Sequence, residues 1–207
     1  MAHSLRRIIA LFMFSTGCAS SLAQAIDPAP ITRHYEAGVE ELQSIWEILP
    51  SPSGTLLLAG SFWLCEYDGH EFRKLISPSV FSLAMDPGDS TIYAGTRDGF
   101  GFLTQDEQGR IVLHGLTDLL PDSIEVGAVR HVSVTKNKVF FIGSFMVYTY
   151  DKSTRKCEVY DFKSRLVRGF PVGDSLFIGN YAMGLQILYN NRVSMAPFGD
   201  FFKGMNL

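Results

Sequence analysis

The side chains able to do acid–base chemistry are few in this sequence, and they are not paired as catalysis requires. Adjacent carboxylates occur at Glu40-Glu41 and at Asp106-Glu107. The first pair precedes the regular part of the chain and the second lies in a predicted turn, so solvation accounts for both. Hydrolysis of a glycosidic bond uses two opposed carboxyl groups, and the strands expected to lie innermost offer Glu47 and little else. Two-carboxylate catalysis therefore has little support.

The histidines are scattered, and no two have the spacing of metal ligands. Those beyond the N-terminal segment are His34, His70, His114 and His131. His131 alternates with apolar residues and could line a central channel, although a packed or rim position is the commoner role. The turn Asp151–Thr154 has the composition of a polar hairpin tip and lacks the alternating acidic ligands of a calcium loop.

Motifs for nucleophilic or phosphate chemistry do not occur either. There is no G-x-S-x-G nucleophile elbow and no phosphate-binding loop of the G-x-x-x-x-G-K type. We therefore predict no catalytic residue, no metal site and no cofactor, and we expect that the chain is not an enzyme by itself.

The composition indicates an all-β chain without affinity for nucleic acid. The formal net charge is −3, from 18 basic and 21 acidic residues, so no basic field is present to hold a phosphate backbone. Phe occurs 16 times, Tyr 8 times and Gly 19 times among the 207 residues. Abundant aromatic residues and regularly spaced glycines are typical of many short strands.

An internal repeat is the strongest indication of the fold in this sequence. Four units each contain a short apolar strand that ends in Gly followed by a small or polar residue: Gly60-Ser61, Gly95-Thr96, Gly143-Ser144 and Gly179-Asn180. The successive glycines are 35, 48 and 36 residues apart. This period matches four-stranded β-propeller blades. An insertion at Thr117–Ser123 explains the longer step, and coincidental spacing in a β-sandwich is the alternative.

The apolar runs and the turns agree with blades. Runs such as Leu56–Ala59 and Val139–Ile142 suit strands buried on both faces, and the following Gly lets the backbone approach its neighbour closely. We predict a β-propeller with four visible four-stranded blades, part of a larger ring of about seven blades. The expected blades are 44–78, 79–127, 128–164 and 165–200, with 201–207 as the start of another.

The N-terminal residues 1–25 have the pattern of a signal peptide. Arg6 and Arg7 precede the apolar run Ile8–Phe14, which is shorter than the roughly 20 residues of a membrane span. An A-x-A motif places cleavage between Ala25 and Ile26. We expect export to the periplasm, and a leader at 26–43 that includes a candidate closing strand.

Three cysteines are present, and none is predicted to form a disulfide. Cys18 lies in the signal segment, where a lipid anchor is a minor alternative, since Ser15 stands where a lipobox usually has Leu. Cys65 and Cys157 fall in the first and third repeats, on blades that are not neighbours. Although an oxidising compartment permits a bridge, we expect free, partly buried thiols.

Aromatic residues near strand ends are the candidates for ligand contact. Stacking on sugar rings would use such side chains, whereas packing between blades is the commoner role of each. No ligand-binding residue is therefore assigned among Trp46, Trp63, Phe100, Phe145 and Tyr181.

The amino-acid sequences of the repeats resemble those of the two-component regulator propeller family. The resemblance spans roughly residues 31–207 and is carried by Ser44–Gly60, Tyr67–Arg73, Gly95–Leu103, Asp106–Gly109 and Leu116–Pro121. The second blade looks like that of large sensor regulators of Bacteroidetes-type bacteria, whose propeller precedes a β-sandwich, a transmembrane helix and a histidine kinase or helix-turn-helix output domain. Those parts do not occur in this sequence, and we interpret it as the N-terminal portion of a longer protein.

The resemblance implies a periplasmic module that senses a ligand and signals to a membrane-spanning output. Its partners would be a small molecule or oligosaccharide, because related regulators often govern carbohydrate use, together with the remaining blades and the output domain. The alternatives are a secreted propeller lyase or glycosidase acting on polysaccharide, and a plain protein-interaction scaffold.

Overall fold

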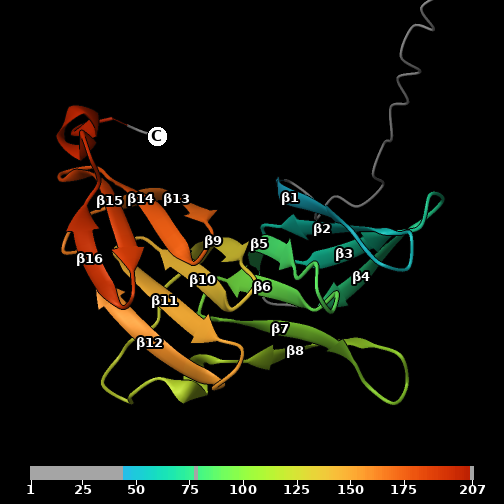
Figure 1. Ribbon diagram of the computed structural model, residues 1–207. Coiled ribbons are helices and arrows are strands. Elements are labelled where there is room, and N and C mark those ends of the chain that lie inside the picture. The colour runs from blue at the N-terminus through green and yellow to red at the C-terminus, as the bar shows by residue number, and fades with distance from the viewer. Residues whose placement is uncertain (1–43, 77–78, 206–207) are drawn as a thin grey trace, which may run out of the picture. The chain divides into compact units, whose positions relative to one another are not determined.

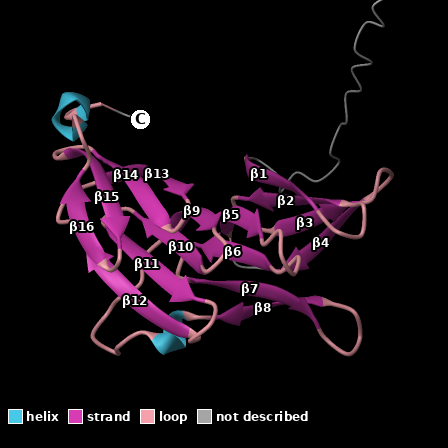
Figure 2. Ribbon diagram, in the orientation of Figure 1, coloured by secondary structure: helices cyan, strands magenta, loops and turns pink. Residues whose placement is uncertain are grey.

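A computed structural model describes residues 44–76 and 79–205 of the chain, and these residues fold into sixteen strands and two short 3-10 helices. Figure 1 shows the strands in chain order, and Figure 2 shows how little helix accompanies them. The predicted signal segment, its cleavage position at Ala25 and Ile26, Cys18, His34 and the candidate closing strand lie outside the described residues.

The strands form four antiparallel sheets of four consecutive strands each. Blade 1 contains β1 (Ile45–Pro50), β2 (Leu56–Gly60), β3 (Leu64–Tyr67) and β4 (Phe72–Ile76). Blade 2 contains β5 (Val80–Met85), β6 (Ile92–Thr96), β7 (Phe100–Gln105) and β8 (Ile111–Gly115). Blade 3 contains β9 (Val129–Val134), β10 (Lys138–Gly143), β11 (Met146–Asp151) and β12 (Lys156–Asp161). Blade 4 contains β13 (Leu166–Val172), β14 (Ser175–Asn180), β15 (Gly184–Tyr189) and β16 (Arg192–Met195). The prediction of four four-stranded blades is therefore confirmed.

The first strand of each blade is the innermost. β1 contacts β5, β5 contacts β9, and β9 contacts β13. The fourth strands are the outer ones, and all four residues of β16 are exposed.

The apolar second strand of a blade can pack against both neighbouring blades. In β10, Val139 and Phe141 pack toward blade 2, whereas Phe140 and Ile142 pack toward blade 4. Alternate side chains of a strand point to opposite faces, so a strand between two neighbouring blades needs an unbroken apolar run. Three buried clusters of this kind fill the three interfaces between consecutive blades.

The insertion between blades 2 and 3 is anchored to the core by the leucines at either end of a short helix. The 3-10 helix η1 spans Thr117–Leu119, and the flanking Leu116 and Leu120 are buried against Phe100 and Tyr148. A second 3-10 helix, η2 (Gly199–Phe202), contacts β15. Neither helix has the length or apolarity that crossing a bilayer would need, and the described residues contain no other helix.

Aspartates stabilise the hairpins between third and fourth strands. Asp68 accepts hydrogen bonds from the backbone of His70 and Glu71 at 2.8 and 2.9 Å. Asp151 accepts them from the backbone of Ser153 and Thr154 and from both hydroxyl groups, which lowers the pKa of its carboxyl to about 2. Such Asx turns are the usual reason for Asp at a tight reversal. Asp151–Thr154 is thus a hairpin tip, as its composition indicated.

Both described cysteines are free thiols, as expected. Cys65 is fully buried rather than partly buried, because β3 packs on both sides, and burial raises its pKa. Cys157 is half-buried, and burial raises its pKa to about 11. Thiols held in the neutral form are poor nucleophiles.

Candidate functional site

The inner strand of every blade is interrupted by a β-bulge at the same place. Pairing with the second strand skips one residue in each of the first three blades, and in blade 4 residues 167–168 together face one residue of β14. The skipped residues are Trp46, Phe81 and Arg130. A bulge leaves its extra residue unpaired and re-aims its side chain. Four equivalent positions are thereby turned out of the regular ladder.

The repeat glycines lie opposite these bulges. Gly60 pairs with Ile45, Gly95 with Ser82, and Gly143 with Val129, each next to the skipped residue. Gly179 is the residue of β14 that faces the blade 4 bulge. The expected close approach is clearest at Gly95, where an added Cβ would lie 2.7 Å from the carbonyl oxygen of Val129. The glycine signature of the sequence therefore marks the bulged end of each blade.

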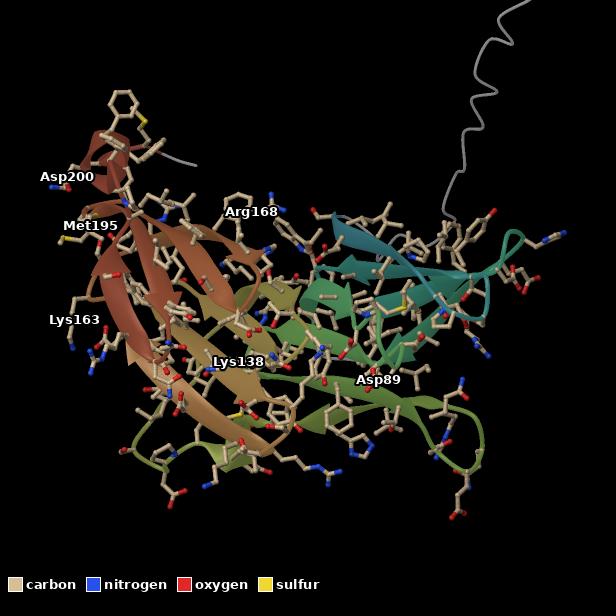
Figure 3. All side chains as sticks on the ribbon, viewed as in Figure 1. Asp89, Lys138, Lys163, Arg168, Met195 and Asp200 are labelled. Atoms are coloured by element: carbon tan, nitrogen blue, oxygen red, sulfur yellow. The ribbon has the colours of Figure 1, made fainter. Side chains whose placement is uncertain are left out.

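A cavity of about 550 Å³ lies at this end of the inner strands. All four blades line it, and the bulge residues are among the lining. The cavity has the size of sites that hold small ligands, about 300–1,000 Å³. Arg168 of β13 is labelled in Figure 3. The charged and aromatic side chains of the lining, with one histidine, are Trp46, Glu47, Phe81, Arg130, His131, Arg165 and Arg168.

Hydrogen bonds join the inner strands of neighbouring blades. The Glu47 carboxylate accepts from the Ser82 hydroxyl at 2.6 Å and from the backbone N–H of Leu83 at 2.8 Å. The Ser82 hydroxyl oxygen accepts from the backbone N–H of Val132 at 3.0 Å. His131 Nε2 lies 3.1 Å from the carbonyl oxygen of Gly169. These bonds link blade 1 to blade 2, blade 2 to blade 3, and blade 3 to blade 4.

His131 is a structural donor as well as a lining residue. A carbonyl oxygen can only accept, so Nε2 carries the proton that it shares with Gly169. Burial lowers the pKa of His131, and the nearby Arg168 guanidinium lowers it further. The charge of Glu47 and the bond to Gly169 act in the opposite direction. The imidazole is therefore neutral near pH 7. His131 lines the cavity and also packs against blade 4, so the lining role and the packing role considered for it both apply.

Removing the Glu47 carboxylate should weaken the junction between blades 1 and 2. Ser82 and Leu83 are almost fully buried, so Glu47→Ala leaves two buried donors without this acceptor. A buried donor that loses its acceptor costs about 1–3 kcal/mol, and the lower value applies to each donor here because Glu47 is only half-buried. We expect the free energy of unfolding in urea to fall by about 2 kcal/mol for Glu47→Ala and by less for Glu47→Gln, which keeps one acceptor oxygen. The exposed Glu71→Ala is the control, and equal losses in Glu47→Ala and Glu71→Ala would contradict the assignment.

The aromatic candidates divide into core and surface residues. Phe100 is buried and stacks on Phe141 at 4.3 Å, as packing between blades requires. Trp63 is half-buried and packs on the small cluster around Cys65. For the other three, the expectation of core packing is wrong, because bulges and loops turn them outward: Trp46, Phe145 and Tyr181 are 54%, 54% and 46% exposed. Only Trp46 of these lines the cavity.

Three arginines in the cavity lining were not singled out from the sequence. Arg130, Arg165 and Arg168 are exposed, and none forms an ion pair with the parts of the chain that the structure describes. They lie up to 38 residues apart and share no local motif. The available signal was positional, since Arg130 stands in the third repeat where Trp46 and Phe81 stand in the first two.

A metal centre is not among the features of this site. Within residues 44–76 and 79–205, no three His, Cys, Asp or Glu side chains are grouped so that they could hold a metal ion. The one carboxylate in the cavity lining, Glu47, is engaged by Ser82 and Leu83. The arrangement offers cationic and aromatic surface for binding.

No family model and no curated protein matches the chain. Solved structures do match. One is the extracellular domain of the B. thetaiotaomicron protein BT3049, described as a hybrid two-component system: TM-score 0.61, 18% identity, covering 79% of this chain and 26% of that one. Another is the extracellular domain of BT4673 from the same organism, described as a one-component system: TM-score 0.58, 17% identity, covering 77% of this chain and 22% of that one.

The likeness also extends to a computationally designed protein, Ika8, with a TM-score of 0.51 and 12% identity over 72% of this chain and 48% of that one. The chain spans about a quarter of the length of the two B. thetaiotaomicron domains. At these identities the matches show the fold, and at that level they agree with the resemblance carried by the repeats. The chain thus has a β-propeller fold that it shares with extracellular domains of bacterial signalling systems.

Proposed function

We propose that the chain is an extracytoplasmic, ligand-sensing propeller module of a membrane-spanning signal-transduction regulator, and that an oligosaccharide is its ligand. The observation that carries the proposal is the cavity at the bulged ends of the inner strands, to which all four blades contribute. Exposed aromatic rings beside polar side chains suit a hydrophilic ligand with flat apolar faces. The shared fold with extracellular domains of regulators supports the same role.

The location of the cavity suggests how binding becomes a signal. A ligand that touches the inner strands of four blades favours one relative arrangement of those blades over others. A ligand shifts a conformational equilibrium by its differential affinity for the two states. In the complete regulator, that arrangement would be read by the parts that follow the propeller. Export through the segment that ends at Ala25 is part of the same proposal.

Binding rather than catalysis is proposed because the one carboxylate of the cavity lining already holds two buried donors. An acid–base pair for polysaccharide cleavage would need a second opposed carboxyl group. Incubation of the chain with each ligand that binds should release no new reducing ends or unsaturated products. Turnover that Glu47→Gln abolishes would replace the proposal with an enzymatic function.

Tryptophan fluorescence tests the proposal, because Trp46 and Trp63 are the only two tryptophans of the chain. In Trp63→Phe, all tryptophan emission comes from Trp46 in the cavity lining. We expect at least one member of an oligosaccharide panel to shift that emission and to raise the melting temperature. Phe81→Ala should abolish both effects, while Phe145→Ala, which changes an exposed ring outside this cavity, should not. A panel without effect on either readout would overturn the proposal.

A further inference from the structure

The cavity lining is cationic on a chain that is acidic as a whole. Three guanidinium groups and one carboxylate face it, whereas the formal net charge of the sequence is −3. A concave site lined by one sign of charge raises the local concentration of ligands of the opposite sign. The charge distribution of the site therefore differs in sign from that of the whole molecule.

Aromatic faces, and not carboxylates, hold two of the three arginines. The guanidinium carbon of Arg130 lies 5.1 Å from the ring centre of Phe81, and that of Arg168 lies 5.7 Å from that of Phe170. Stacking on a ring fixes the plane of a guanidinium without neutralising its charge. The N–H edges of these groups remain available for a carboxylate, sulfate or phosphate, which arginine binds through two parallel hydrogen bonds.

The aromatic part of the lining is continuous with the cationic part. Trp46 packs edge-on against Phe81, with ring centres 6.0 Å apart, and Arg130 covers Phe81. These three residues are the bulge residues of blades 1, 2 and 3, so one row of equivalent positions presents a ring, a second ring and a cation. Glu47 offsets one of the three positive charges of the lining, and its carboxylate accepts from Ser82 and Leu83.

We infer that this cavity selects an acidic sugar, with the oxyanion held by Arg130, Arg165 and Arg168 and a sugar ring packed on Trp46. The inference rests on the proposed function and adds the charge class of the ligand. Carboxylate and sulfate groups share the chemistry that guanidinium recognises, so uronic acids and sulfated sugars are the two sources. A neutral sugar would leave the three guanidinium groups without a partner from the ligand.

Matched probes separate charge from ring contact. Trigalacturonic acid and its methyl ester have the same rings and differ in the charge of the carboxyl groups, and a sulfated galactan trisaccharide places the oxyanion elsewhere on the ring. We expect one or both acidic probes to bind by calorimetry at least about tenfold more tightly than the ester. Their affinity should fall on raising NaCl from about 20 to about 200 mM, because salt screens exposed charges.

Arginine variants locate the contact. Arg130→Gln and Arg168→Gln should each weaken the acidic probe about tenfold or more and leave the binding of a neutral probe unchanged. Arg192→Gln, which removes an exposed arginine of β16 outside the cavity, should have no effect. Melting temperature checks that each variant is folded, and the ester comparison and the salt dependence need no variant.

The outcomes distinguish this inference from the function on which it rests. Preference for trigalacturonate, for the sulfated trisaccharide or for both supports it and identifies the oxyanion. Equal binding of the methyl ester and the acid, or unchanged affinity in Arg168→Gln, overturns it while oligosaccharide sensing stands. If no probe binds but a neutral member of the panel shifts Trp46 emission, the acidic-sugar inference fails alone. If nothing in the panel acts on Trp46, both fail.

Discussion

Lys152→Ala should lower the free energy of unfolding by about 3–5 kcal/mol, because it leaves the buried carboxylate of Asp86 without its cationic partner. The Lys152 ammonium forms an ion pair with Asp86 and donates to the carbonyl oxygens of Thr135 and Lys136 at 2.5 and 3.2 Å. The Asp86 side chain is only 6% exposed. Asp86 follows β5 of blade 2, and Lys152 follows β11 of blade 3, so the pair joins two blades at the strand ends remote from the cavity. Urea denaturation followed by circular dichroism measures the loss.

A second Lys–Asp pair in the same blade provides the control. Lys163 pairs with Asp161, but these side chains are 83% and 36% exposed. Exposed ion pairs contribute about 0–1 kcal/mol, so Lys163→Ala should change stability little. The double variant Asp86→Leu/Lys152→Met should regain most of the loss, because it removes both buried charges together. Equal effects of Lys152→Ala and Lys163→Ala would contradict the assigned role.

Gly95→Ala should lower the free energy of unfolding by about 3 kcal/mol through overpacking between blades 2 and 3. An added Cβ would meet the carbonyl oxygen and the Cγ1 atom of Val129, both at 2.7 Å. Val129 is fully buried in the innermost strand β9. Backbone oxygen cannot rotate away as the end of a side chain can, so β6 and β9 must separate. Differential scanning calorimetry and urea denaturation should agree on the loss.

The equivalent glycine of the next repeat is the matched control. At Gly143 an added Cβ would have its nearest neighbours, two carbonyl oxygens, at 3.4 Å. That spacing needs only a small adjustment, and Gly→Ala also lowers the entropy of the unfolded chain by the equivalent of about 0.4–1 kcal/mol. Gly143→Ala should therefore stay within about 1 kcal/mol of the native chain. If Gly95→Ala were as stable as Gly143→Ala, close approach would not explain the glycine at position 95.

The blades themselves were predictable because their pairing is local. Each sheet joins strands that are consecutive in the sequence, through turns that Gly54, Asp68 or Asp151 stabilise. Alternation along β10 serves two interfaces, and an unbroken apolar run is the visible consequence. Because each blade is one continuous stretch of sequence, the same pattern recurs once per blade. The sequence alone therefore reveals the blades and how many of them lie within residues 44–205.

The burial of individual aromatic residues was not predictable in the same way. Phe100 and Trp46 both stand near strand ends, yet one is 2% and the other 54% exposed. The difference comes from the register, because a bulge of one residue exchanges the two faces of a strand. No property of the Trp46 side chain reports that shift.

What the amino-acid sequence determined here is the repeat, the blades and the absence of familiar catalytic motifs, since all of these depend on short-range pattern. Only the tertiary structure brought Trp46, Arg130 and Arg168 to one cavity, because residues from separate blades meet there after the inner strands have packed side by side. The repeat glycines connect the sequence pattern with the tertiary structure. They are visible as a spacing in the sequence, and in the fold they mark the bulges that turn the lining residues toward one another.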